Sequence, residues 1–191
     1  MRTPFLLLFM ISICGRSQNL ESLKSDTRKL YDANYNMDFD AVAALTYPKV
    51  YEGIGLVAFT EKLDADYENP VFRKRLQIVE PVFQYSEMKI ENDTKFYVIT
   101  YKNPVRYFFE NKLNTATAKQ KADSLKTSAM AYEVVIEPQR NTINVKRYSK
   151  LIAISDKNTN GEWRFFNFDD PVQRQSFNAL FEDRVKKALG L

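Results

Sequence analysis

The carboxylate best placed to do chemistry is Glu80, in the stretch LQIVEPVF. On a regular strand it shares a face with Leu76, Ile78 and Val82, which would put its carboxyl group among apolar side chains. Loss of water there would raise its pKa and make it a usable general acid or base. The following Pro81 favours the opposite orientation, because proline often marks an edge or a bulge that would turn Glu80 to solvent. Both orientations stay open.

A set of tyrosines is the other candidate site. The stretch KFYVITY is apolar on both faces of a strand, with Tyr97 and Tyr101 on the same one. If helices cover the opposite face, this one needs a cover, a partner or a ligand. Phenols combine apolar bulk with a polar tip and so suit a small-ligand pocket, although an ordinary aromatic core gives the same pattern. The candidate ligand-binding residues are Tyr47, Tyr51, Tyr97, Tyr101, Tyr107 and Tyr148.

The composition narrows the possible chemistry. The 191-residue chain has no histidine, and its only cysteine is Cys14. An imidazole base, a thiolate nucleophile downstream of Cys14 and a zinc site of the usual ligands are therefore excluded. With only five glycines and none of the common phosphate-binding or hydrolase motifs, we expect no cofactor and no metal. These absences disfavour an enzyme without excluding one.

The first 17 residues have the pattern of a signal peptide. Arg2 is followed by an apolar run over residues 5–13, which is too short for a spanning helix of about 20 residues. Gly15 and Ser17 supply the small residues of a cleavage site, so we predict cleavage after Ser17. A lipoprotein anchored on Cys14 is the disfavoured alternative. Residues 18–191 would then form one exported domain, periplasmic or secreted, with no transmembrane segment.

The mature chain would contain no cysteine, which favours a bacterial envelope protein because exported eukaryotic domains often carry disulfides. The densest basic cluster is Arg73-Lys74-Arg75. Alternation along a strand would divide these three side chains between two faces, and the formal net charge is only +4. We therefore expect no nucleic-acid partner.

The apolar periodicity predicts the elements that must position these residues. Helical spacing indicates three N-terminal helices, over about 20–34, from Asp38 to before Pro48, and from Gly55 to before Pro70. Alternation then predicts strands at 75–83, 87–91, 95–101, 132–137, 142–148, 150–155 and 162–168, with an inserted helix at 116–131 and a final helix at 172–189. Helices followed by a meander imply an α+β domain with a mainly antiparallel sheet.

This order, together with DFDAVAALTYPKVYEGIG and GEWRFFNFD, resembles small exported bacterial proteins of the nuclear transport factor two-like superfamily. The resemblance covers about residues 20–170. It implies a cone in which a curved sheet wraps the N-terminal helices and leaves a pocket. Catalytic members similar to dehydratases and cyclases use Asp and His, which this chain cannot supply. Members similar to isomerases and epoxide hydrolases use Tyr, Asp and Arg, but no local motif places those roles here.

Three functions are compatible with these observations. The first is an exported non-catalytic binding module with an aromatic-lined pocket for a small apolar ligand. The second is an interaction protein that forms a homodimer through its sheet face. The third is a His-free isomerase or hydrolase that uses a buried carboxylate, such as Glu80, beside a tyrosine.

Overall fold

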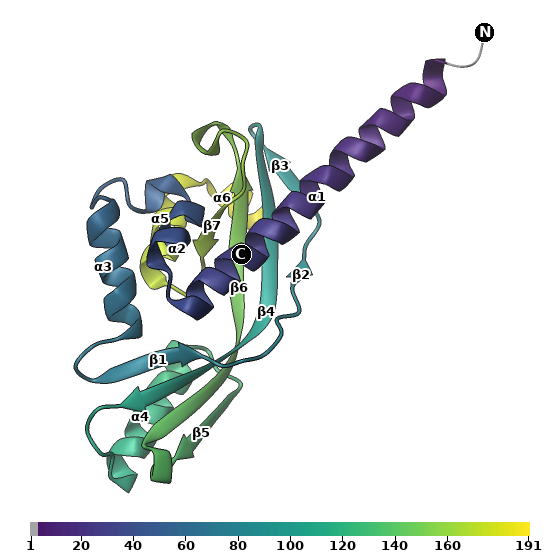
Figure 1. The fold of residues 1–191 in the computed structure, drawn as a ribbon. Coiled ribbons are helices and arrows are strands. Elements are labelled where there is room, and N and C mark those ends of the chain that lie inside the picture. Colours follow the sequence, from purple (N-terminus) through teal and green to yellow (C-terminus); the bar gives the residue numbers. More distant parts are fainter. Residues whose placement is uncertain (1–3) are drawn as a thin grey trace.

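The computed structural model describes the backbone of residues 4–191 and the side chains of residues 20–191 (Figure 1). Three helices precede the sheet: α1 (Pro4–Asn36), α2 (Phe39–Leu45) and α3 (Leu56–Tyr67). The strands are β1 (Phe72–Leu76), β2 (Gln84–Tyr85), β3 (Lys89–Glu91), β4 (Thr94–Phe109), β5 (Glu133–Glu137), β6 (Thr142–Ser155) and β7 (Arg164–Asn167). Helix α4 (Thr115–Ser128) lies between β4 and β5, and α5 (Pro171–Leu180) and α6 (Asp183–Ala188) end the chain. The predicted α+β architecture is confirmed.

Local signals explain where several helices begin. The Asp38 carboxylate accepts a hydrogen bond from the Ala41 N–H at 3.0 Å and caps α2, as predicted. Gly55 precedes α3 with a φ of 83°, a left-handed conformation that glycine adopts without a steric penalty. Asp170 caps α5 by accepting from the Val172 N–H at 2.8 Å. The cap at Asp170 also fixes a carboxylate close to the cavity described below.

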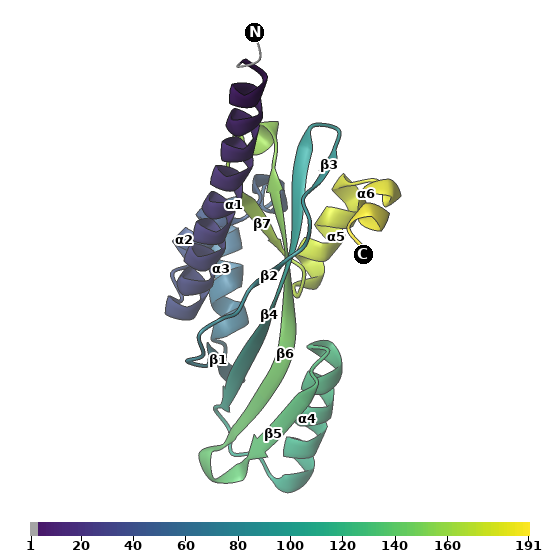
Figure 2. The same cartoon turned by 90° about the vertical axis from the view of Figure 1, so that its right-hand side faces the viewer.

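The sheet is built around the long antiparallel pair of β4 and β6. Their register runs without a break from Lys95 opposite Ser155 to Phe108 opposite Thr142. Strands β1, β2 and β3 pair in turn along the other edge of β4, and β5 and β7 pair with β6. In Figure 2, α1–α3 lie on one side of this pair and α5 and α6 lie on the other. Because side chains alternate along a strand, neighbouring residues of β4 and β6 project into two separate cores, one on the side of α1–α3 and the other on the side of α5 and α6.

Two strands are longer than predicted. We expected a strand ending near residue 101, yet β4 continues through Pro104 to Phe109. The Pro104 carbonyl accepts from the Gln77 N–H at 2.9 Å, on the edge away from β6, so the missing proline N–H removes no bond between β4 and β6. The break expected between 148 and 150 is absent as well. Ser149 is buried and pairs with Tyr101 inside a continuous β6.

Two other predicted elements are wrong in their placement. In place of the strand expected at 75–83, β1 ends at Leu76 and is followed in the chain by an irregular segment that contacts α1. There the Tyr31 hydroxyl donates to the Val79 carbonyl at 3.1 Å, and Pro81 cannot donate to a sheet. The single helix expected at 172–189 is broken at Phe181, whose extended backbone turns the chain so that its ring packs on Phe96 at 5.3 Å.

The predicted signal peptide occupies residues 1–17. Residues 1–3 lie outside the described residues, and residues 4–17 are described only as backbone of α1, which projects from the body of the fold in Figure 1. Cleavage after Ser17, a lipid on Cys14 and export therefore stay predictions. Over the described part of the chain, no helix combines the length and the apolar character needed to cross a bilayer.

Candidate functional site

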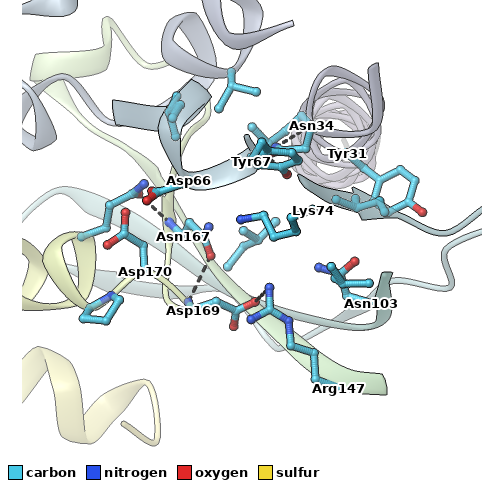
Figure 3. A pocket seen from close by; sticks show the side chains of 18 of the residues that line it. Tyr31, Asn34, Asp66, Tyr67, Lys74, Asn103, Arg147, Asn167, Asp169 and Asp170 are labelled. Atoms are coloured by element: carbon cyan, nitrogen blue, oxygen red, sulfur yellow. Dashed lines mark hydrogen bonds and ion pairs between the residues drawn. The ribbon is translucent and has the colours of Figure 1, made fainter. Parts of the chain in front are cut away.

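A cavity of about 590 Å³ lies between the three N-terminal helices and the middle of the sheet. Its walls come from α1, α2, α3, β1, β4, β6 and β7, and the end of α4 and the start of α5 also contribute. This volume is within the range of small-molecule sites, roughly 300–1,000 Å³. Figure 3 shows that its labelled lining is a mixture of aromatic, amide and charged side chains. We consider this cavity the candidate site.

The register of the strands places the polar residues of the cavity on one face. Along β4, Tyr101, Asn103 and Tyr107 alternate with residues that point to the opposite side. Arg147 on β6 stands opposite Asn103, and Lys74 on β1 stands opposite Tyr107. Directly opposed residues of antiparallel strands project to the same face. All five side chains therefore reach the cavity from three neighbouring strands.

Lys74 is the unusual cation of the cavity. Its ammonium lies 4.1 Å from the centre of the Tyr67 ring, a cation–π contact. No carboxylate among the residues with described side chains forms an ion pair with it. Burial, with a smaller contribution from the positive charge of Arg147, lowers the pKa of Lys74 from 10.5 to about 8. Part of this lysine is therefore a neutral amine near physiological pH.

Arg147 belongs to a chain of hydrogen bonds along the cavity wall. Its guanidinium lies 3.3 Å from Asp169, which also accepts from the Ser149 hydroxyl at 2.5 Å. Ser149 in turn accepts from the Asn103 amide nitrogen at 2.7 Å. This chain holds Arg147 and Asn103 in fixed positions opposite each other on β6 and β4.

The network leaves two buried polar atoms without a hydrogen-bond partner: Nε of Arg147 and Oδ1 of Asn103. An unpartnered buried polar group costs about 1–3 kcal/mol, so each such group needs an explanation. One is a donor and the other is an acceptor, and both belong to residues that line the cavity. Both atoms are fully buried and have no surface open to the cavity, so their residues line the cavity with other atoms.

Lys62 also lines the cavity but, unlike Lys74, forms ion pairs with carboxylates. It lies 2.7 Å from Asp66 and 3.2 Å from Asp170, and these carboxylates help to raise its pKa although burial opposes them. Lys62 is therefore neutralised within the protein, as Arg147 is in part by Asp169. Lys74 is a cavity cation that forms no ion pair with any described carboxylate, although Asp66 and Asp170 act on its charge from a longer distance.

Four tyrosines line the cavity, and two of them are among the sequence candidates. Tyr101 projects from β4 as expected, Tyr107 projects from the part of β4 beyond the predicted strand, and burial raises the pKa of each. Tyr31 and Tyr67 come from α1 and α3 and were not among the candidates. The Tyr67 hydroxyl donates to Asn34 at 3.1 Å. These phenols supply the apolar part of the wall.

The structure does not bring the other four candidate tyrosines to the cavity. Tyr47 lies in the core beyond the sheet and donates to Asp156 at 2.8 Å. Tyr51 stacks on Phe59 at 5.3 Å, and Tyr97 meets Trp163 edge to face at 5.6 Å. Tyr148 is 60% exposed. The expectation that all six tyrosines share one pocket is therefore corrected.

Glu80 lies in the irregular segment after β1, and its side chain is 76% exposed. Its carboxylate forms an ion pair with Arg28 on the outer surface of α1. Of the two orientations that the sequence left open, the solvent-facing one is present. Glu80 does not line the cavity, so it has no place in the cavity chemistry.

Sequence reasoning did not identify Lys74, Asn103 and Arg147 as site residues, although a signal was present. The prediction that alternation splits Arg73-Lys74-Arg75 is confirmed, since Arg73 pairs with Glu110 on the surface while Lys74 points inward. Alternate residues of a strand share a face, so Asn103 lies on the same face of β4 as the buried Val105, and Arg147 lies on the same face of β6 as the buried Val145. A polar residue on such a face marks a candidate site.

The arrangement is suited to holding an acidic group against an aromatic wall. Arg147 and Lys74 supply positive charge, and the tyrosines supply apolar surface. Among the described side chains, no cluster of three or more acidic, histidine or cysteine residues could hold a metal ion.

Neither a known family model nor a curated protein matches this chain. The resemblance to the nuclear transport factor two-like superfamily therefore stays a prediction, and the function has to be argued from the cavity itself.

Proposed function

We propose that this chain is a non-catalytic binding module whose cavity takes a small organic anion with an apolar body. The observation that carries the proposal is that one cavity holds both Lys74, which has no carboxylate within ion-pair distance among the described side chains, and Arg147. A carboxylate bound between them would compensate the charge of Lys74, since Arg147 is already paired with Asp169. Hydrogen bonds to charged groups contribute about 1.5–3 kcal/mol each.

The apolar ligand expected from the sequence is refined by this proposal. The phenols of Tyr31, Tyr67, Tyr101 and Tyr107 and the side chains of Leu30 and Leu63 remain suited to an apolar body. Arg147 and Lys74 add a preference for an acidic head group. An organic acid with an aromatic or branched side chain, such as 3-phenyllactate, combines both features.

Export is part of the same proposal and rests on the signal-like pattern of residues 1–17. The interaction protein and the His-free enzyme stay predictions without an observation that favours them. The enzyme hypothesis required a buried acid beside a tyrosine hydroxyl. The Asp156 carboxylate accepts from Tyr47, but both residues lie outside the cavity. Within the cavity wall, Asp169 is already paired with Arg147 and Ser149.

The test is calorimetric titration of the protein with 3-phenyllactate and with 3-phenylpropanol, which keeps the ring and lacks the acid. We expect the acid to bind at least about tenfold more tightly, the equivalent of 1.4 kcal/mol. Lys74→Met and Arg147→Met should each weaken binding of the acid at least about tenfold, because each removes one cation from the cavity. Lys102→Met is the matched control, since Lys102 is exposed on the other face of β4.

Binding of both compounds with equal affinity would overturn the proposal, as would full affinity in Lys74→Met. Absence of binding by phenyllactate, hexanoate and benzoate alike would also overturn it. Circular dichroism of each variant separates loss of the site from loss of the fold.

A further inference from the structure

We propose that Lys74 captures its ligand covalently, as a reversible imine with the carbonyl carbon of a 2-keto acid whose carboxylate is held by Arg147. The inference rests on the proposed function, since it requires that the cavity bind organic acids. It adds the class of ligand, a keto acid, and a chemical role for Lys74 beyond its charge.

The position of Lys74 supports a nucleophilic role. The strand register fixes its Cα opposite Tyr107, and its ammonium end lies over the Tyr67 ring. In Figure 3 the side chains of Lys74 and Arg147 approach the same interior space from different strands. In a 2-keto acid the carbonyl carbon is bonded directly to the carboxylate carbon. A cation that holds the carboxylate therefore presents the carbonyl to a neighbouring amine.

The surroundings of Lys74 favour its neutral form. Arg147 from β6 and Lys62 from α3 oppose its positive charge, whereas Asp66 from α3 and Asp170 before α5 favour it. Both of these carboxylates are already in ion pairs with Lys62. With a pKa of about 8, roughly a quarter of Lys74 is unprotonated at pH 7.5, against about 0.1% of a lysine with the ordinary value of 10.5.

The other groups that face Lys74 do not remove this advantage. The phenols of Tyr67 and Tyr107 are neutral near pH 7.5, because burial raises the pKa of each. Lys62 is the internal comparison: it lines the same cavity, but its carboxylate partners keep it protonated. Of these two lysines, Lys74 alone combines a site beside Arg147 with a substantial fraction of free amine.

The reaction balances without any further reagent. The lone pair of neutral Nζ attacks the carbonyl carbon, a C–N bond forms, and the π electrons of the C=O bond move to oxygen. Proton transfer from nitrogen to oxygen gives a neutral carbinolamine. Loss of its oxygen as water, with both former amine protons, leaves the C=N bond. Hydrolysis reverses each step and releases the keto acid unchanged.

The experiment uses 3-phenylpyruvate with sodium cyanoborohydride, which reduces an imine to a stable secondary amine. We expect the intact mass to rise by one phenylpyruvate less an oxygen atom, and peptide mapping should place the adduct on Lys74. Labelling of Lys74 should exceed that of any other lysine at least about tenfold, following its larger fraction of free amine. Excess phenyllactate, which has no ketone, should suppress the adduct by competition.

Lys74→Arg is the decisive variant, because it keeps the positive charge and removes the nucleophilic amine. It should form no adduct at position 74. Lys102→Arg, on the exposed face of β4, should label at Lys74 as the wild type does. Both variants are checked for native structure by circular dichroism.

The outcomes separate the two proposals. Binding of phenyllactate without an adduct on Lys74, or with adducts spread evenly over surface lysines, overturns the imine and leaves the binding function standing. Failure of both acids to bind overturns both proposals. A Lys74 adduct that phenyllactate suppresses supports both.

Discussion

The two faces of the β4–β6 pair are both rich in aromatic side chains, yet one is filled and the other holds a cavity. On the face under α5 and α6, Phe177 meets Phe166 at 5.3 Å and Phe168 at 5.2 Å, and all three rings are buried. Tyr47 stacks on Phe166 at 5.1 Å in the same cluster. On the face under α1–α3, tyrosines surround a volume of about 590 Å³.

The difference between these faces lies in their polar residues rather than in their aromatic content. The filled face carries large apolar side chains such as Phe96 and Ile152 along the middle of its strands. The cavity face has Asn103 and Arg147 at directly opposed positions and Lys74 on the neighbouring strand. A cluster of phenyl rings can pack to the density of a core, whereas charged side chains require partners or space. An aromatic pattern alone therefore does not distinguish a core from a site.

The largest effect should come from Phe177→Ala, which empties the centre of the filled face. Removing a fully buried phenylalanine costs about 3–5 kcal/mol of unfolding free energy, measured by urea denaturation. Binding of phenyllactate by the folded protein should be unchanged, because Phe177 is not part of the cavity wall. Leu180→Ala, at the exposed end of the same helix and outside the cavity wall, is the control. A loss below about 1 kcal/mol would mean that this face is not tightly packed.

Lys74→Met should act in the opposite direction on stability. Burial lowers the pKa of Lys74 to about 8, so its charged form is less stable in the folded chain than in the unfolded chain. At pH 7, where the amine is mainly charged in both states, an apolar side chain of similar length should therefore stabilise the protein by up to about 3 kcal/mol. The same change should weaken phenyllactate binding at least about tenfold. Denaturation and titration of one preparation measure both effects. Lower stability than the wild type would contradict the comparison between the faces.

The same lysine predicts a pH dependence. Because its pKa is lower in the folded state than in the unfolded state, the unfolded chain binds more protons between about pH 8 and 10.5, and stability rises with pH over that window. Between pH 8 and 9.5 the unfolding free energy should rise by about 1.5 kcal/mol relative to Lys74→Met. Tyrosines also begin to ionise in the unfolded chain within this window, but they do so in both proteins, so their contribution cancels in the difference. Parallel curves for the two proteins would show that Lys74 is not shielded from solvent.

Glu80→Gln should have the smallest effect. Its ion pair with Arg28 is exposed to solvent, and such pairs contribute little to stability. We expect the denaturation midpoint and the affinity for phenyllactate to equal those of the wild type within experimental error. A clear loss of affinity would mean that the irregular segment after β1 takes part in the site, and would extend the functional region beyond the cavity face.

Much of the fold follows from local signals in the sequence. Asp38, Gly55 and the apolar spacing of residues 56–67 define α2 and α3, and the spacing of small residues defines α4 with Ala118 and Ala122 buried. The predicted strands failed where distant partners decide their ends. Pro104 suggests a turn, but β4 passes through it because the proline nitrogen lies on the edge away from β6.

The candidate site was only partly visible in the sequence. Tyr101 was found because alternation along one strand is a local property, whereas Tyr107 was named only because a phenol suits a pocket wall. Tyr31 and Tyr67 were not identified, since a helix position that faces a cavity has the same spacing as one that faces a core. Glu80 was singled out on the expectation of a regular strand at 75–83, which the chain does not form.

By itself, the sequence determined the absence of imidazole chemistry, the helix caps and the alternation that separates Lys74 from Arg73 and Arg75. Only the tertiary structure decided which face of the sheet is filled and which encloses a cavity, because that depends on how α3, β1 and the segment before α5 meet across β6. It also decided that Lys62 has two carboxylate partners and Lys74 has none among the described side chains. Charge compensation depends on distances between residues far apart in the chain, and local sequence does not encode those distances.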